Sequence, residues 1–193
     1  MRKSYFTLIE MLVVIAIIII LAGMVLAGIQ VVRKKQAVVL TVTYMKQLEV
    51  AIGQYQQIYS YLPFTLEAGT SADYLVNDPD DNGDLDDGNS KYQTLLLCLS
   101  ASGTTATEIG LNPRRQKFIE LDENDQYVDA WGNDFRVAMD LEYDDSIDSA
   151  QVWGAGDLKR NIAIWSAGRD EQDSATDGDA VNDDNQGSWT KRN

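Results

Sequence analysis

The sequence of 193 residues contains no histidine and only one cysteine, Cys98. An intramolecular disulfide is therefore impossible, and the side chain that most often serves as a general base is missing. Cys98 lies inside the apolar stretch 95–99, which favours a buried structural thiol over a nucleophile. No phosphate-binding glycine loop, dinucleotide fingerprint or catalytic dyad with histidine occurs. We therefore expect a protein that is not an enzyme.

Charge is missing from residues 11–32, a run of 22 mainly apolar residues. A helix of that length measures roughly 33 Å at about 1.5 Å per residue, which is enough to cross a bilayer. A cleavable secretory signal has an apolar core of only about 7 to 15 residues, so we expect a retained transmembrane helix. Glu10 stands at its start, where a carboxylate is costly and usually marks a function. The alternative is a glutamate that rests at the membrane interface.

Residues 6–17 read Phe-Thr-Leu-Ile-Glu-Met-Leu-Val-Val-Ile-Ala-Ile. This stretch resembles, almost letter for letter, the N-terminal signal of type IV pilins and of type II secretion pseudopilins. The resemblance implies that a prepilin peptidase cuts before Phe6 and methylates the new amine. It also implies that Glu10 pairs with this amine on a neighbouring subunit during fibre assembly. The N-terminus would then lie in the bacterial cytoplasm and the head in the periplasm, joined by a single pass through the inner membrane.

The leader of that signal would be residues 1–5, and its last residue departs from the family. Tyr5 stands where the family has glycine. Because a tyrosine ring would crowd a peptidase site built for no side chain, we expect cleavage to be slow. A chain that stays uncut would remain a membrane-tethered head that does not polymerise.

Apolar and aromatic side chains continue beyond the uncharged run, at alternating steps of three and four residues. They are Val38, Thr41, Met45, Leu48, Ile52, Tyr55, Tyr59 and Leu62. This spacing places them on one helical face. Pro63 follows and should end the helix. We predict one continuous helix over residues 6–62, which is apolar on all sides in its transmembrane or fibre-core part, 6–35, and amphipathic in 36–63.

Residues 64–193 should form a single small α+β head with a pilin-like fold. The spacing of apolar residues predicts a short helix over 91–99, whose inward side chains are Tyr92, Leu95, Leu96 and Leu99. Short apolar segments separated by turn residues predict strands at 118–121, 127–130, 135–139 and 162–165, and within the third of these Phe135, Val137 and Met139 alternate. Such strands form a small antiparallel sheet that packs against the amphipathic part of the long helix.

The charges of the chain are unevenly distributed. Residues 1–66 carry six basic and two acidic side chains, whereas residues 67–193 carry ten basic and 28 acidic ones. An acidic head of this kind repels nucleic acid, so we expect no nucleic-acid partner. Its carboxylates suit either a solvated surface or divalent cations.

Two stretches near the C-terminus resemble the major pseudopilins specifically. Residues 129–133, Asp-Ala-Trp-Gly-Asn, are similar to an Asp-Pro-Trp-Gly-Asn turn of that family, and residues 166–170 are similar to its Ser-x-Gly-x-Asp loop. The resemblance implies a calcium ion in the C-terminal loop, with Asp170, Asp183 and Asp184 as the first candidate ligands. Glu171 departs from the family, which has glycine there. The alternative is a solvated acidic tail.

A second candidate calcium loop lies in residues 78–89. Its potential ligands fall on alternate positions of an EF-hand-type loop and are Asp78, Asp80, Asn82, Asp84 and Asp86. Gly83 stands at the sharp turn, but Asn89 replaces the closing glutamate, which should weaken binding. An ordinary solvated loop is the alternative.

These patterns together favour a structural protein. We predict a subunit of a type II secretion pseudopilus that assembles through its N-terminal helix to support protein secretion. Its partners would be further copies in a helical fibre, other pseudopilins, the prepilin peptidase and the inner membrane. The alternatives are a type IV pilin-like fibre subunit for adhesion or motility, and the tethered calcium-binding head.

Overall fold

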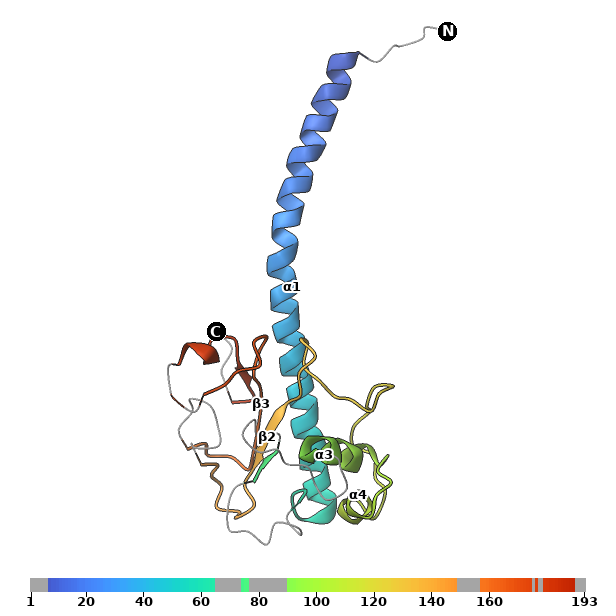
Figure 1. The fold of residues 1–193 in the computed structure, drawn as a ribbon, viewed down its shortest axis with the longest axis vertical. Helices are drawn as coiled ribbons and strands as arrows, with labels where there is room; N and C mark the ends of the chain where they lie inside the picture. Colours follow the sequence, from blue (N-terminus) through green and yellow to red (C-terminus); the bar gives the residue numbers. More distant parts are fainter. Residues whose placement is uncertain are drawn as a thin grey trace. The chain divides into compact units, whose positions relative to one another are not determined.

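The computed structural model describes residues 7–64, 74–76, 90–148, 157–174, 176 and 179–189 (Figure 1). Within helices and strands it describes only the backbone of residues 25–28, 30, 31, 74, 106 and 107. The chain forms two compact units, Met1–Val39 and Leu40–Asn193. In order, its elements are α1 (Leu8–Tyr59), β1 (Tyr74–Val76), α3 (Lys91–Ser100), α4 (Ala106–Leu111), β2 (Arg136–Met139), β3 (Ile162–Ser166), the 3-10 helix η2 (Ala180–Asn182) and β4 (Gln186–Gly187). The fold is α+β, as predicted.

Helix α1 comprises 52 residues and agrees closely with the predicted long helix. It ends earlier than Pro63, because Ser60 adopts the left-handed conformation with φ 66°. The N–H of Ser60 donates to the carbonyl oxygen of Gln56 at 2.7 Å. A left-handed residue at this position terminates a helix and satisfies one of its last carbonyl groups.

In the N-terminal unit, the described apolar side chains of α1 are exposed on every side. Their exposed fractions lie between 48% and 84% at Leu8, Ile9, Met11, Leu12, Val13, Val14, Ile15, Ile17, Ile18, Ile19, Ile20, Leu21 and Met24. Among the residues that the structure describes, no helix meets the length and the apolarity that crossing a membrane requires. Within the predicted span 11–32, the side chains of residues 25–28, 30 and 31 lie outside the described residues.

In the C-terminal unit, α1 buries one face in the main core. Met45, Leu48, Ile52 and Tyr55 are fully buried, which confirms the predicted face. The same core contains all four side chains predicted to point inward from α3, together with the buried thiol of Cys98. Tyr55 also donates its hydroxyl to the carbonyl oxygen of Leu111, so the end of α4 is tied to α1.

The sheet is antiparallel throughout, with the strand order β1-β2-β3-β4. Figure 1 shows β2 and β3 beside the C-terminal part of α1. Because side chains alternate along a strand, Val137 and Ile164, which are register partners, face the main core. Their neighbours Ala138, Ala163 and Trp165 join a second, smaller cluster. The sheet therefore buries apolar side chains on both faces.

Two of the four predicted strands are wrong. Residues 118–121 form no strand: the N–H groups of Phe118 and Ile119 both donate to the carbonyl oxygen of Leu99, at 2.8 and 3.4 Å. In residues 127–130 only Val128 pairs, through an isolated bridge to Asp134. The predictions at 135–139 and 162–165 correspond to β2 and β3. Strands β1 and β4, which are two or three residues long, were too short to produce an alternating pattern.

Candidate functional sites: an N-terminal carboxylate and a C-terminal loop

Glu10 lies in the first turn of α1 and forms a capping box with Thr7. Its carboxylate accepts hydrogen bonds from the N–H of Thr7 at 2.7 Å and from the Thr7 hydroxyl at 2.8 Å. In return, the Thr7 hydroxyl oxygen accepts from the N–H of Glu10 at 3.3 Å. This reciprocal pattern stabilises a helix start. The predicted assembly carboxylate therefore has a local structural role, while Tyr5 and Phe6 lie outside the described residues.

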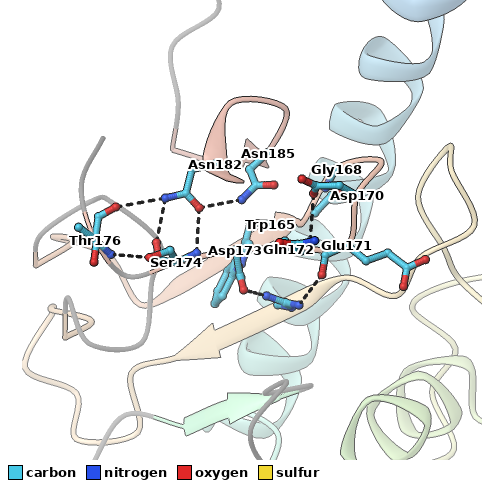
Figure 2. Close-up of polar contacts among 12 residues, drawn as sticks. Trp165, Gly168, Asp170, Glu171, Gln172, Asp173, Ser174, Thr176, Asn182 and Asn185 are labelled. Carbon is cyan, nitrogen blue, oxygen red and sulfur yellow. Dashed lines mark hydrogen bonds and ion pairs between the residues drawn. The ribbon is translucent and has the colours of Figure 1, made fainter. Parts of the chain in front are cut away.

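The C-terminal candidate site is the loop 167–185, which connects β3 with β4 and contains Asp170, Asp183 and Asp184. Few bonds close it, since β3 and β4 share only two register pairs, Trp165 with Gly187 and Ser166 with Gln186. Figure 2 shows the polar contacts of this loop. Much of its order must therefore come from side chains.

One anchor of the loop is a buried ion pair between Arg136 on β2 and Asp173, whose side chains are 10% and 12% exposed. The indole N–H of Trp165 donates to the second carboxylate oxygen of Asp173 at 2.8 Å. Arg136 also donates to the carbonyl oxygen of Glu171 at 3.5 Å. Glu171 adopts φ 61°, a conformation that favours glycine, which is the residue the resembled family has there. Asp173 therefore holds the loop to the sheet.

A second anchor is Asn182 in η2, whose amide uses its full hydrogen-bonding capacity. Its nitrogen donates to the carbonyl oxygens of Ser174 at 2.9 Å and Thr176 at 3.3 Å. Its oxygen accepts from the N–H of Ser174 at 2.9 Å and from the side-chain nitrogen of Asn185 at 3.1 Å. Asn182 thus joins both halves of the loop, as the dashed lines in Figure 2 show.

The side-chain oxygen of Asn185 is the exception in this network. Asn185 is only 6% exposed, and among the residues that the structure describes its side-chain oxygen has no hydrogen-bond partner. The amide cannot be turned over, because its nitrogen must donate to the Asn182 oxygen. An unsatisfied buried acceptor costs about 1–3 kcal/mol. In Figure 2 this oxygen points away from Asn182, toward the side of Gly168 and Asp170.

The three predicted aspartates take different positions around this amide. Asp184 is half-buried, and its carboxylate accepts from the N–H of Arg169 at 2.8 Å. A Cβ on Gly168 would come within 2.5 Å of the Asp184 carboxyl carbon, and Gly168 has φ 71°, so this contact requires glycine. Asp184 and the turn 168–170 are therefore brought together.

Asp170 and Asp183 are both exposed. One carboxylate oxygen of Asp170 accepts from the N–H of Gln172 at 3.0 Å, and Asp183 is the C-terminal cap of η2. Across the described residues, no three histidine, cysteine, aspartate or glutamate side chains are grouped so that they could hold a metal ion. The predicted trio is therefore not assembled, although Asp184 and Asn185 are adjacent in sequence.

The donor chemistry of the loop nevertheless fits a hard cation in part. Calcium takes oxygen ligands from carboxylates, side-chain amides and backbone carbonyls, and the buried, unsatisfied oxygen of Asn185 is such a donor. Asp184 supplies a carboxylate next to it in the chain. The second candidate site, with Asp78, Asp80, Asn82, Asp84 and Asp86, lies outside the described residues.

The two stretches that resemble the major pseudopilins contact each other. The buried carboxylate of Asp129 accepts from the N–H groups of Trp131 at 2.8 Å and Asn133 at 2.9 Å, and from the hydroxyl of Ser166. Asn133 donates in turn to the carbonyl oxygen of Gly168 at 2.8 Å. The 129–133 turn therefore fixes the start of the candidate loop.

Asp134 follows this turn directly, and the pKa of its side-chain carboxyl group is shifted. Asp134 as a whole is exposed, but partial desolvation of its carboxylate, and then the nearby carboxylate of Asp129, raise its pKa above the usual 3.8. Its carboxylate is thus less favourable in the folded protein than in water.

Comparisons of the chain with protein-family models, curated proteins and solved structures find no match. What the two sites do must therefore be inferred from their own residues.

Two features of the sites were missed by sequence reasoning. The Thr-x-x-Glu spacing of Thr7 and Glu10 is itself a capping signature, and it could have been recognised. The role of Asn185 could not, because nothing in the sequence distinguishes it from Asn182, the other asparagine of the acidic loop. Its importance depends on burial, which only the folded chain reveals.

Proposed function

We propose that this chain is a pilin-like fibre subunit, anchored in the inner membrane by the N-terminal part of α1 and assembled into a type II secretion pseudopilus. The observation that carries the proposal is the exposure of apolar side chains all around residues 8–24. A surface helix of a soluble protein has one apolar face, whereas this segment has no polar face at all. It needs an apolar environment on every side.

Two environments meet that requirement: the bilayer before assembly and the fibre core after it. Before assembly, the acyl chains of the bilayer surround the uncharged run 11–32, which has the length of a membrane span. After assembly, the same side chains pack against the helices of neighbouring copies in the fibre core. Moving from lipid to protein gains little hydrophobic energy, so polar contacts must help to select the fibre.

Glu10 supplies such a polar contact. In the isolated chain its carboxylate accepts hydrogen bonds from Thr7, so the carboxylate oxygen is partly satisfied while its charge still lacks a cationic partner among the described residues. In the fibre, we propose that the carboxylate binds the new amine of Phe6 on a neighbouring copy. The role of the chain is then assembly rather than catalysis, and the fibre's action in the periplasm supports protein secretion together with other pseudopilins.

The acidic C-terminal loop extends this proposal to calcium. We propose that the ion is held by Asn185, Asp184, Asp170 and Asp183, and that it supplies positive charge that relieves the repulsion between these carboxylates. Asn185 and Asp184 would be the core ligands, because they are the buried and half-buried members of this set. The loop 78–89 is proposed as a second, weaker site.

The N-terminus of the protein isolated from membranes tests the central claim. Mass spectrometry should find a chain that starts at a methylated Phe6, with a fraction of uncut chain that reflects the slow step at Tyr5. Tyr5→Gly should abolish the uncut fraction in a cell that contains the peptidase. A chain that retains Met1 in full, in the parent and in Tyr5→Gly alike, would instead identify a membrane-tethered head.

A further inference from the structure

The segment directly after the candidate calcium loop is bonded to helix α1 through Ser188. Ser188 is 7% exposed and follows β4. Its N–H donates to the carbonyl oxygen of Ile164 at 2.8 Å, and its hydroxyl oxygen accepts from the N–H of Ile164 at 3.1 Å. Ser188 therefore continues the pairing with β3 after β4 has ended.

Three charged side chains meet at Ser188. The ammonium group of Lys46 on α1 donates to the Ser188 carbonyl oxygen at 3.0 Å, and it also forms an ion pair with Glu49 at 2.7 Å. Arg160 donates to the Ser188 hydroxyl at 2.8 Å and lies 3.7 Å from the Glu49 carboxylate. We call Ser188, Lys46, Glu49 and Arg160 the Ser188 clasp.

We propose that the Ser188 clasp couples the cation site of loop 167–185 to helix α1, with Ser188 as the positioning residue. The inference rests on the calcium site proposed above and adds a physical connection from that site to helix α1. Only the two residues of β4 separate Ser188 from the loop, so a change in the order of the loop reaches Ser188 over a short stretch of strand. A cation that binds Asp184 and Asn185 fixes the chain three residues before Ser188.

Such coupling has to act in both directions. If an ordered loop strengthens the clasp, an intact clasp must strengthen cation binding by the same factor. The positive charge of Lys46 allows the coupling to be distinguished from a simple electrostatic effect on calcium binding. Loss of the positive Lys46 would by charge alone make the acidic unit more attractive to calcium, whereas loss of the coupling makes binding weaker. The two explanations therefore predict opposite signs.

The experiment measures calcium affinity by titration calorimetry on the full chain in detergent. Lys46→Met keeps the apolar stem and removes the ammonium group. Lys117→Met is the matched control, because it makes the same change in net charge and because, among the described residues, Lys117 pairs only with the exposed Glu120 in the i+3 position. We expect Lys46→Met to weaken calcium binding by about fivefold or more, and Lys117→Met to leave it unchanged or slightly tighter.

Hydrogen exchange on the parent protein gives a second, independent measurement. Calcium should slow amide exchange in peptides covering residues 44–52 of α1 as well as in the loop, and magnesium should do so less. In Lys46→Met the loop should still respond while 44–52 should not. If that variant does not fold, Ser188→Ala, which removes only the hydroxyl, is compared in the same way.

The outcomes separate the inference from the proposal beneath it. Absence of any calcium binding to the parent overturns both the site and the coupling. Calcium binding that protects the loop but leaves 44–52 unchanged overturns the coupling alone. Equal affinities in Lys46→Met and Lys117→Met also overturn the coupling, because the lost ammonium group then acts only through its charge.

Discussion

The two parts of helix α1 use apolar side chains in opposite ways. In residues 8–24 they are exposed around the whole circumference, whereas in residues 41–55 most lie on one face, where Met45, Leu48, Ile52 and Tyr55 are fully buried, and Val50 is exposed. The secondary structure is the same in both, so helical geometry does not decide the difference. The pattern of polar residues does: the second part has a polar face to present to water, and the first has none.

This difference assigns separate tasks to the two parts. The buried face of residues 41–55 contributes to folding stability, because its area is removed from water within the chain itself. The apolar surface of residues 8–24 contributes little to the stability of one chain and is available for a bilayer or for other copies. Substitutions in the two parts should therefore affect different measurements.

The largest expected effect is the loss of fibre assembly when Glu10, at the start of α1, is replaced. Glu10→Leu should leave insertion into the membrane intact, or improve it, because a charge is removed. It should abolish incorporation into fibres, because the amine of Phe6 on the adjacent copy would lie unpaired in an apolar bundle. The measurement is the amount of subunit in sheared fibres relative to the amount in membranes.

Thr7→Val is the control for the capping role of Glu10. It removes the hydroxyl that caps the helix but keeps the carboxylate, so the helix start should lose about 0.5–2 kcal/mol while fibres still form. If Glu10→Leu and Thr7→Val reduce fibres equally, the capping box explains the result and the role of Glu10 in assembly is rejected.

The second effect concerns the free energy of unfolding and the buried face of α1 in residues 41–55. Leu48 is fully buried in the main core, so Leu48→Ala should lower the free energy of unfolding by about 2–5 kcal/mol. Ile18→Ala, in the exposed part of the same helix, should change it by no more than about 0.5 kcal/mol. Denaturant unfolding of the full chain in detergent can be followed by the fluorescence of the buried Trp165. Equal losses in both variants would show that residues 8–24 are packed within the chain.

How much of the structure could be predicted from the sequence depends on how far apart along the chain the contacting residues lie. The long helix, its buried face and α3 were predicted because their signals repeat every three or four residues. The strand predictions failed where pairing is decided by residues distant in the sequence. Residues 118–121 have the composition of a short strand, yet the N–H groups of Phe118 and Ile119 donate to Leu99 of α3 instead of to a strand. Local pattern cannot specify such a partner.

The candidate loop shows the same limit. Its acidic composition was visible in the sequence, and the two stretches that the resemblance singled out, the 129–133 turn and residues 166–168, contact each other. The individual roles were not visible. Asp173 is an anchor because Arg136 arrives from β2, and Asn185 is a candidate ligand because packing buries it without a partner for its oxygen.

The smallest effect is expected at Asp134, an exposed residue of the C-terminal unit whose carboxylate is disfavoured by partial desolvation and by Asp129. The pKa of Asp134 is raised in the folded protein, so the folded state binds this proton more tightly than the unfolded state does. Stability is therefore lost as the pH rises from 3.8 through the raised pKa. Asp134→Asn should raise the melting temperature near pH 7 by about 2 °C or less, and the gain should vanish well below pH 3.8.

Glu123→Gln, on an exposed turn, is the control that removes the same charge at another exposed position. Its effect on the melting temperature at pH 7 should be smaller than that of Asp134→Asn. If both variants gain equally, the benefit comes from the lower net charge of the acidic unit. Asp134 would then behave like any solvated carboxylate, and the contrast between buried and exposed groups would apply to the apolar side chains alone.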